Sequence, residues 1–305
     1  MKYFFVTLLI VTAFAVNTNK AIAQKNNWAN KIDSLSLDTL NDISIRLENL
    51  GQTMITVSDE NARLIAAYNF VKTLLVAFRI HNSYFYPFDS IKNISVLVSP
   101  DNNFRIFTWN IALNTESYQN FGVIQLNPDY MKKIKDTTNL RSFYPLIDKS
   151  EIYKRAMDTT ANNLHWFGAL YYKIILNKHK NKTYYTLLGW DGNTKMSNKK
   201  IVESLYFENN IPFFGAPIFD MKNTQYPKPL KRLIFEYNNY ANMALRYEPS
   251  KEILVQENVA PTRQQDYGKP ETYVPDGSYD YYKFNKKNGK WEKQIGMLKD
   301  FNMQK

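Results

Sequence analysis

The chain has 305 residues, a formal net charge of +11 and no cysteine. This length is ample for one large domain or two small ones, and the lack of cysteine excludes disulfide bonds and thiol catalysis. A basic chain with 15% aromatic residues is also typical of nucleic-acid binding. Its lysines are dispersed, however, with only short pairs such as Lys132-Lys133 and Lys286-Lys287. We therefore expect no nucleic-acid partner, and instead a solvated basic surface that tolerates or attracts anionic polymers of a cell envelope.

The N-terminus has the pattern of an export signal. Lys2 supplies a positive charge, Phe4–Val16 is an apolar run of 13 residues, and Ala21-Ile22-Ala23 matches a small-residue cleavage site. A membrane span needs about 20 apolar residues, so we expect cleavage rather than a retained anchor. The sequence predicts a signal peptide over residues 1–23 and an exported mature chain, periplasmic or extracellular, with no transmembrane segment.

Residues 24–90 are predicted to be helical. Apolar residues recur at helical spacing as far as Leu50, where Gly51 is expected to end the first helix. Ser34 or Ser36 is expected to cap its start.

A second helix is predicted to begin at Ser58-Asp59-Glu60 and to run to about Ile80, because a capping residue is followed there by two acids at the positive end of the helix dipole. Its apolar residues step by four, three, four and three, which predicts a stripe that faces the core. The stripe consists of Leu64, Tyr68, Val71, Leu75 and Phe78.

From Ile91 the pattern changes to short strands, rich in β-branched and aromatic residues and separated by polar turns. Two turns, Pro249-Ser250-Lys251 and Lys287-Asn288-Gly289, predict hairpins, and the proline-rich residues 257–278 predict an extended loop. Phe213–Phe219 carries two prolines and is expected at a sheet edge. The predicted strands are Ile94–Val98, Phe104–Ile111, Gly122–Leu126, Ala169–Leu176, Thr183–Trp190, Ile201–Phe207, Leu230–Tyr237, Asn242–Tyr247, Glu252–Gln256, Tyr279–Asn285 and Lys290–Ile295.

Strands that follow strands at short intervals pair antiparallel. We therefore predict an α+β, β-dominated fold, in which the helical segment 24–90 packs on a large antiparallel meander sheet, arranged as a sandwich or a partly open barrel. Residues 91–305 form the predicted β domain, continuous with the helical segment.

Several stretches together resemble one protein family. They are GALYY at 168–172, YTLLGWDG at 185–192, FGAPIF at 214–219, KRLIFEY at 231–237 and PDGSYDYYKF at 275–284. In this order they are similar to a family of uncharacterised secreted proteins from Bacteroidota-type bacteria. The resemblance covers roughly Phe104 to Trp291. It implies export and one continuous unit, and it implies no activity.

Trp190-Asp191-Gly192-Asn193 is the most conspicuous turn in the sequence. Calcium takes six to eight oxygens, whereas the residues after this turn include several lysines and no series of spaced acids. We therefore expect a turn in which Asp191 bonds its own backbone, and neither a metal nor a cofactor. Most aromatic residues are expected to fill the core, and Trp190 is the best candidate to stack on a sugar.

Paired carboxylates are the remaining catalytic pattern, because two acids about 5–9.5 Å apart can hydrolyse a glycoside. Glu203 lies in one predicted strand, Glu236 in the next, and Asp191 in a neighbouring turn. Strand alternation places Glu203 on the same face as Leu205 and Phe207, which indicates partial burial. Asp191, Glu203 and Glu236 are therefore candidates to bind a ligand.

Other catalytic signatures are missing from the sequence. It contains no Gly-x-Ser-x-Gly motif, and His81, His165 and His179 lie far apart with no spacing that pairs them. We assign no catalytic residue and no metal ligand.

These observations favour a non-enzymatic periplasmic or secreted β-rich module that binds an envelope or extracellular ligand, such as a glycan or an envelope protein. Two alternatives remain open. One is a hydrolase that cleaves a polysaccharide or glycopeptide with paired carboxylates, and the other is a structural partner in an envelope assembly. Converging acids in a cleft favour the hydrolase, an exposed aromatic strip favours the binding module, and a large flat apolar face favours the assembly partner.

Overall fold

The computed structural model describes residues 29–222 and 226–294, so the predicted signal peptide lies outside the described residues. The chain divides into two compact units. One contains the described residues up to Thr56 together with Leu64–Lys92, and the other contains Val57–Arg63 and the described residues from Asn93 onward. Among the described residues, none of the helices combines the length and the apolar character that crossing a membrane requires.

The helix α2 spans Ser34–Thr56. Asp33 caps it, because its Oδ1 accepts a hydrogen bond from the Ser36 backbone N–H at 2.9 Å. The prediction that Ser34 or Ser36 caps the helix is therefore wrong. The prediction that Gly51 ends it is also wrong, since Gly51 is buried inside a helix that continues to Thr56. A single glycine lowers helix propensity by about 1 kcal/mol, which is too little to end a helix that is buried along one face.

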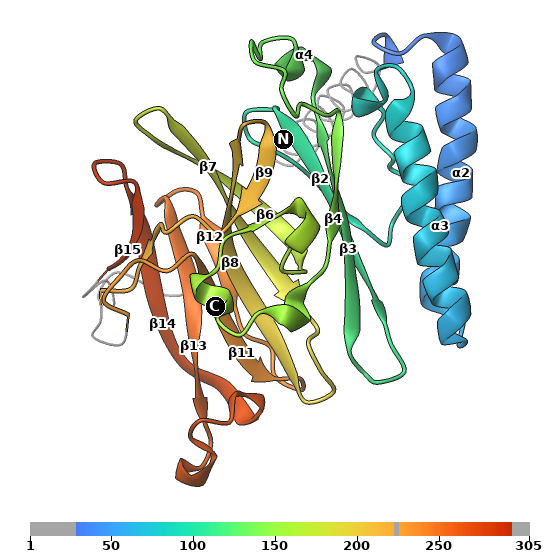
Figure 1. Ribbon diagram of the computed structural model, residues 1–305. Helices are drawn as coiled ribbons and strands as arrows, with labels where there is room; N and C mark the ends of the chain where they lie inside the picture. Colours follow the sequence, from blue (N-terminus) through green and yellow to red (C-terminus); the bar gives the residue numbers. More distant parts are fainter. Residues whose placement is uncertain (1–28, 223–225, 295–305) are drawn as a thin grey trace, which may run out of the picture. The chain divides into compact units, whose positions relative to one another are not determined.

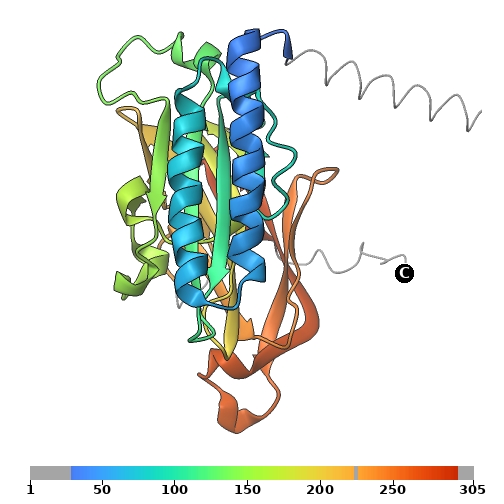
Figure 2. The same cartoon turned by 90° about the vertical axis from the view of Figure 1, so that its right-hand side faces the viewer.

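The helix α3 spans Glu60–Arg79 and is capped by Asp59, whose Oδ1 accepts from the Ala62 N–H at 2.7 Å. Figure 2 shows α2 and α3 side by side as the two blue helices. The predicted stripe is confirmed only in part, because Phe78 is buried, Leu64, Val71 and Leu75 are half-buried, and the side chain of Tyr68 is 51% exposed. The large side chains misled the prediction, because small alanines occupy much of the buried face. That face consists of Ala66, Ala67, Phe70, Thr73, Leu74, Ala77 and Phe78.

The second unit is built from strands, and the predicted β-dominated, antiparallel α+β class is confirmed (Figure 1). Its strands form three sheets rather than one large meander. The four-stranded sheet contains β1 (Ser95–Val98), β2 (Phe104–Ala112), β3 (Tyr118–Leu126) and β4 (Phe143–Ile147). The six-stranded sheet contains β5 (Ala161–Asn162), β6 (Leu170–His179), β7 (Lys182–Asp191), β8 (Ser197–Glu208), β9 (Ile211–Phe214) and β11 (Arg232–Asn238). The five-stranded sheet contains β10 (Phe219–Asp220), β12 (Leu245–Glu248), β13 (Ile253–Pro261), β14 (Tyr273–Asn285) and β15 (Lys290–Gln294).

Short helices connect these strands. The segment after β4 contains two 3₁₀ turns, η2 and η3. The short helices are α4 (Pro128–Met131), η2 (Ser150–Ile152), η3 (Ala156–Asp158), η4 (Asn163–His165), η5 (Gln264–Asp266) and η6 (Pro270–Thr272) in this unit, and η1 (Ser83–Phe85) in the first.

The six-stranded sheet is the middle layer of the second unit. Alternate side chains of its strands point to opposite faces, so Leu187 joins a core with Ile106 and Ile124 of the four-stranded sheet. The next residue, Leu188, joins a second core with Leu254 and other residues of the five-stranded sheet. The middle sheet therefore has two buried faces, which explains why its strands read as nearly continuous apolar runs.

The largest error in the strand prediction concerns residues 257–278, predicted as a loop. β13 continues to Pro261 and β14 begins at Tyr273, and the two pair in an antiparallel ladder with a register shift between Glu257 and Val259. Pro261 and Pro275 are tolerated because the outer neighbours of this ladder are short. β12 pairs with β13 only as far as Gln256, and β15 pairs with β14 only from Tyr281 onward. Both prolines therefore lie on a free sheet edge, where no hydrogen-bond donor is needed.

Candidate functional site

A pocket of about 1020 Å³ opens in the second unit. β3 of the four-stranded sheet contributes Tyr118 and Asn120 to its wall, the six-stranded sheet contributes Asp191, and the segment 148–158 forms a further side. Tyr273, at the start of β14, completes the wall on the side of the five-stranded sheet. A site of this size on a rigid sheet is able to surround a small ligand.

Three charged residues form a row across the sheet on one side of the pocket. Asp191 of β7 lies opposite Lys199 of β8, and Lys199 lies opposite Glu236 of β11. Residues directly opposite each other share a face and lie on strands about 4.8 Å apart. The register therefore produces an acid–base–acid row, which we call the outer charge row. All three residues line the pocket.

Asn193 forms hydrogen bonds with all three residues of this row. Its backbone N–H donates to Asp191 Oδ1 at 3.0 Å, which confirms the predicted turn. Its side-chain Nδ2 donates to Glu236 Oε1 at 3.0 Å, and its Oδ1 accepts from Lys199 Nζ at 2.5 Å. Glu236 Oε1 also accepts from the Ser197 hydroxyl at 2.5 Å. One asparagine therefore fixes the positions of all three charged side chains.

A third carboxylate, Asp148, also lines the pocket. Its oxygens accept hydrogen bonds from the backbone and side chain of Asn120 at 3.2 and 3.1 Å, and from the backbone and hydroxyl of Ser150 at 3.0 and 2.6 Å. Gly168 N–H donates to the same carboxylate at 3.3 Å. These bonds hold β3, the end of β4 and the pocket segment together. Asn120 is only 4% exposed, and its Oδ1 accepts no hydrogen bond from the described residues.

Asp191 is easier to protonate than an ordinary aspartate. Its side chain is 5% exposed, and burial raises its pKa above the usual 3.8. The Asn193 N–H and the charge of Lys199 oppose this effect, whereas the negative charge of Asp148 adds to it. The site therefore combines a buried carboxyl of raised pKa with a neighbouring carboxylate saturated by hydrogen bonds.

Glu203 lies on the same face of β8, four residues from Lys199, but deeper in the core. It is opposite Arg232 of β11, and both side chains are fully buried and form an ion pair, with Nη2 to Oε2 at 2.6 Å and Nε to Oε2 at 2.8 Å. The Tyr171 hydroxyl donates to Glu203 Oε1. The prediction that Glu203 contacts a ligand is therefore corrected, because both its oxygens are used inside the protein.

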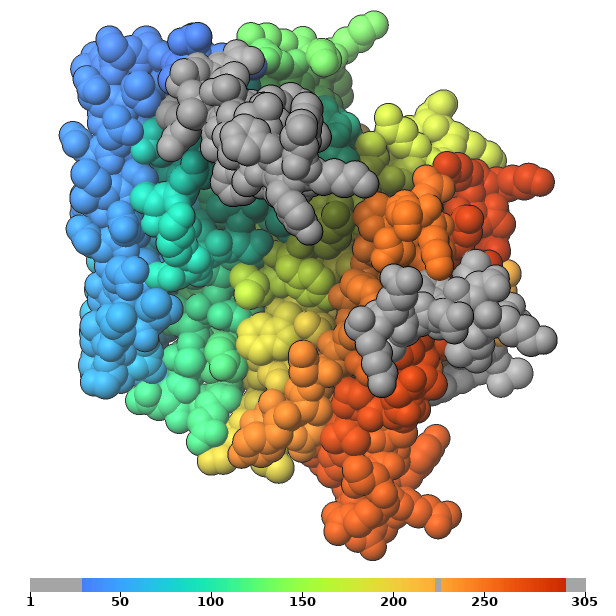
Figure 3. Space-filling model, turned by 180° about the vertical axis from the view of Figure 1, so that it is seen from behind, coloured from blue at the N-terminus to red at the C-terminus, as the bar shows by residue number. Residues whose placement is uncertain are grey.

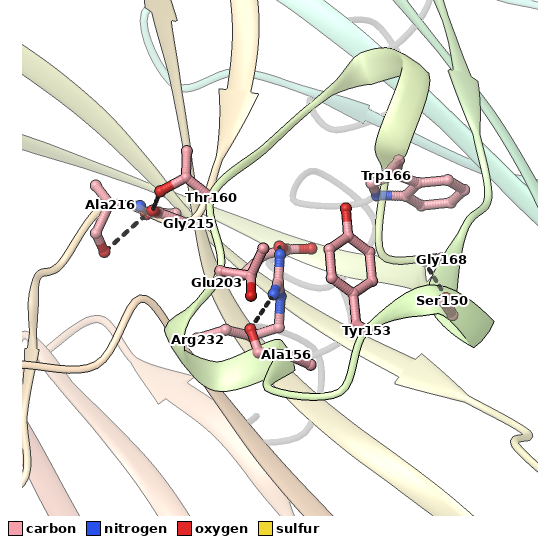
Figure 4. Close-up of polar contacts among 12 residues, drawn as sticks. Ser150, Tyr153, Ala156, Thr160, Trp166, Gly168, Glu203, Gly215, Ala216 and Arg232 are labelled. Carbon is pink, nitrogen blue, oxygen red and sulfur yellow. Dashed lines mark hydrogen bonds and ion pairs between the residues drawn. The ribbon is translucent and has the colours of Figure 1, made fainter. Parts of the chain in front are cut away.

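Arg232 also holds one wall of the pocket in place. Figure 4 shows its guanidinium between Glu203 and the segment that carries Tyr153 and Ala156. Its Nη1 donates to the Ala156 carbonyl at 2.6 Å, and the neighbouring Lys231 N–H donates to the Met157 carbonyl at 2.9 Å. The buried ion pair thus anchors one wall of the pocket.

Trp190 is half-buried, and the structure does not place it among the residues that line the pocket. Its ring meets Tyr118 edge-on, with centroids 5.5 Å apart. Tyr118 in turn lies against Gly192, where an added Cβ would come within 2.1 Å of the Tyr118 ring. Trp190 therefore supports a pocket residue from one side.

The structure brings two of the four predicted residues, Asp191 and Glu236, into one site, together with residues that the sequence did not indicate. Asn120, Asp148 and Lys199 were missed. In the sequence, Lys199 is only one of several lysines after the turn, Asn120 lies in a strand of another sheet, and Asp148 directly follows β4 of that sheet.

No family model, no curated protein and no solved structure matches the chain. Within residues 29–222 and 226–294, no group of three or more histidine, aspartate or glutamate side chains is arranged to hold a metal ion. The functional argument therefore rests on the pocket.

Proposed function

We propose that this chain is an exported binding module whose pocket takes a segment of a glycan. The observation that carries the proposal is the outer charge row, Asp191–Lys199–Glu236, held by Asn193 within a pocket of about 1020 Å³. A pocket with a few fixed polar groups is the usual form of a small-ligand site.

The row supplies donors and acceptors in alternation. A lysine ammonium has three donors and a carboxylate has about four acceptor positions, and the hydrogen bonds described above use only part of that capacity. Each sugar hydroxyl both donates and accepts a hydrogen bond. Neighbouring hydroxyls on a sugar ring therefore fit an array in which a carboxylate, an ammonium and a second carboxylate follow one another.

Aromatic rings in the same pocket suit the apolar faces of sugar rings. Tyr118, Tyr153, Tyr226 and Tyr273 all contribute to the wall. A tyrosine presents a large apolar face together with a polar end, which matches the two kinds of surface on a sugar. The predicted signal peptide and the resemblance to secreted proteins agree with a ligand outside the cytoplasm.

The experiment is a calorimetric titration of residues 24–305 with a panel of envelope and dietary oligosaccharides. Lys199→Met removes the central donor of the row, and we expect about a 10- to 100-fold loss of affinity, because hydrogen bonds to a charged group contribute about 1.5–3 kcal/mol. Lys200→Met is the matched control, since Lys200 is the next residue on β8, points to the opposite face and lies over the Tyr172 ring at 5.1 Å. Equal affinities for both variants, or no binding to any oligosaccharide, would contradict the proposal.

A second candidate function is hydrolysis of a glycoside in the same pocket, and it is favoured by the raised pKa of Asp191. Asp191 would give its proton to the glycosidic oxygen as the bond to the anomeric carbon breaks, while Glu236 would take a proton from the attacking water. The two residues lie two strand intervals apart, about 10 Å between backbones, which is compatible with the separation of about 6.5–9.5 Å between carboxyl groups of inverting enzymes.

Product analysis separates the two candidates. We would incubate each bound oligosaccharide with the wild type and with Asp191→Asn. New reducing ends that appear only with the wild type would establish the hydrolase, whereas binding without product in both would leave the binding module.

A further inference from the structure

Three hairpin turns meet at one end of the second unit, away from the pocket. They join β6 to β7, β12 to β13, and β14 to β15. His179 Nδ1 donates to the Lys286 carbonyl at 3.0 Å, which places the first turn against the third. Lys286 Nζ lies 3.8 Å from Glu252 Oε2, which places the second turn against the third. Figure 3 shows the three turns close together at the upper right, in yellow-green, orange and red.

These turns gather lysines that are far apart in the sequence. Seven lysines lie in the turns or at the strand ends next to them, and six of the seven are exposed, the seventh being half-buried. The acids in the same turns and adjoining strand ends are Glu248 and Glu252, so the net charge of this group is about five positive units. We call this surface the basic end. Its lysines are Lys178, Lys180, Lys182, Lys251, Lys286, Lys287 and Lys290.

Local acids do little to neutralise the basic end. Glu292, beside the third turn, already binds Lys222 Nζ at 3.0 Å and the side-chain amides of Asn285 and Asn288 at 3.2 and 2.7 Å. The Lys286–Glu252 pair is long and exposed on both sides, and such pairs contribute little. Most of the positive charge therefore faces solvent.

We propose that the basic end docks this protein on the surface of an anionic lipid bilayer. The cations are all lysines, which act as point charges, and no arginine, whose planar fork recognises individual phosphates or carboxylates, occurs in these turns. Such a group responds to charge density rather than to a particular molecule. The charges lie on the tips of three separate hairpins that lie against one another, so they are spread over an area rather than along the path of one polymer chain.

This surface is independent of the pocket. None of the seven lysines is among the pocket-lining residues, so docking through the basic end leaves the pocket open. The inference therefore does not rest on the proposed glycan binding, and the two can fail separately.

Each lysine near an anionic bilayer contributes about fivefold to membrane partitioning. Removing three lysines should therefore weaken binding by about a hundredfold. The attraction should also fall with salt, because the Debye length shrinks from about 30 Å at 0.01 M to about 8 Å at 0.15 M ionic strength.

The test is co-sedimentation of residues 24–305 with vesicles of phosphatidylcholine alone or mixed with phosphatidylglycerol. We expect salt-sensitive binding to the mixed vesicles only. The triple variant Lys182→Gln, Lys286→Gln, Lys287→Gln should lose about a hundredfold in partitioning. The matched control, Lys132→Gln, Lys133→Gln, Lys135→Gln, removes three exposed lysines of the same unit and should bind like the wild type. Thermal melts of both variants check that each is folded.

Several results would overturn the proposal. Equal binding to neutral vesicles, equal loss in both triple variants, or no binding to the mixed vesicles would each do so. Tighter binding to soluble dextran sulfate than to vesicles, at equal concentrations of negative charge, would assign the basic end to a soluble polyanion instead of a bilayer.

Discussion

Two charged groups lie on the same face of the six-stranded sheet, and they differ in how completely the protein uses them. The inner group, Glu203 and Arg232, is fully buried. The outer group, Asp191, Lys199 and Glu236, lies along a pocket. Between the two, the register places the apolar pair Ile201 and Ile234.

The carboxylate of the inner group is satisfied by the protein itself. Glu203 accepts hydrogen bonds from the Arg232 guanidinium and from the Tyr171 hydroxyl. The Tyr171 oxygen in turn accepts a hydrogen bond from Trp166 Nε1 at 2.8 Å. Burial and the neighbouring Glu203 charge raise the pKa of Tyr171 well above its usual value, so it remains a donor. The outer group keeps donors and acceptors that a ligand can use. Under the proposed function, the same residue types on the same face serve structure in one row and binding in the other.

The largest expected effect comes from breaking the inner pair. Arg232→Met leaves the Glu203 carboxylate buried without its partner, and we expect a loss of about 3–5 kcal/mol in the free energy of unfolding. Denaturant unfolding measures this loss. The double variant Glu203→Leu, Arg232→Met should recover much of it, because no uncompensated charge remains. If Arg232→Met were as stable as the wild type, the structural role assigned to the Glu203–Arg232 pair would be contradicted.

A smaller effect is expected for Tyr171→Phe. The change removes the donor to Glu203 and leaves Trp166 Nε1 without its acceptor. A buried donor without a partner costs about 1–3 kcal/mol, which denaturant unfolding should detect. Glycan affinity should stay unchanged, since Tyr171 does not line the pocket. A large loss of affinity at unchanged stability would place Tyr171 in the functional row instead.

The outer row should also give a distinct pH dependence. Because the folded pKa of Asp191 is raised, the folded state holds this proton more tightly than the unfolded state does. Its contribution to stability is therefore present in acid and is lost as pH rises from about 3.9 through the folded pKa. The free energy of unfolding of the wild type minus that of Asp191→Asn should fall over this window and be flat above it. A difference that rises with pH would show that the carboxylate is stabilised by its partners.

The smallest expected effect on stability is that of Lys199→Met. The Lys199 side chain is only partly buried, and its Nζ donates a hydrogen bond to a neutral amide oxygen, Asn193 Oδ1. We expect a change below about 1 kcal/mol, the range of partly exposed charge interactions. A loss comparable to that of Arg232→Met would remove the distinction between the two rows.

Local sequence patterns predicted most strands and both hairpin turns, because alternation and turn residues depend on near neighbours. They also indicated that Asp191 bonds its own turn. How deeply a side chain is buried could not be predicted from local patterns. Alternation placed Glu203 on an inward face, but only the register with Arg232 and the packing of Tyr171 show that it is sealed.

Contacts between distant segments account for what was missed. Asn120 reaches the pocket from β3 of another sheet, and Asp148 reaches it from the residue after β4 of that sheet. The lysines judged to be dispersed come together only because three hairpins end at one place, with more than 100 residues between His179 and Lys286. No local pattern carries that information.

The most direct test of the account measures two quantities on one pair of variants. Calorimetric titration with the best oligosaccharide of the panel and denaturant unfolding would be performed on Lys199→Met and Arg232→Met. The account predicts that Lys199→Met loses about 10- to 100-fold in affinity with nearly unchanged stability, whereas Arg232→Met loses stability. Unchanged affinity in Lys199→Met, with the wild type binding the same oligosaccharide, would show that the outer charge row does not bind the ligand.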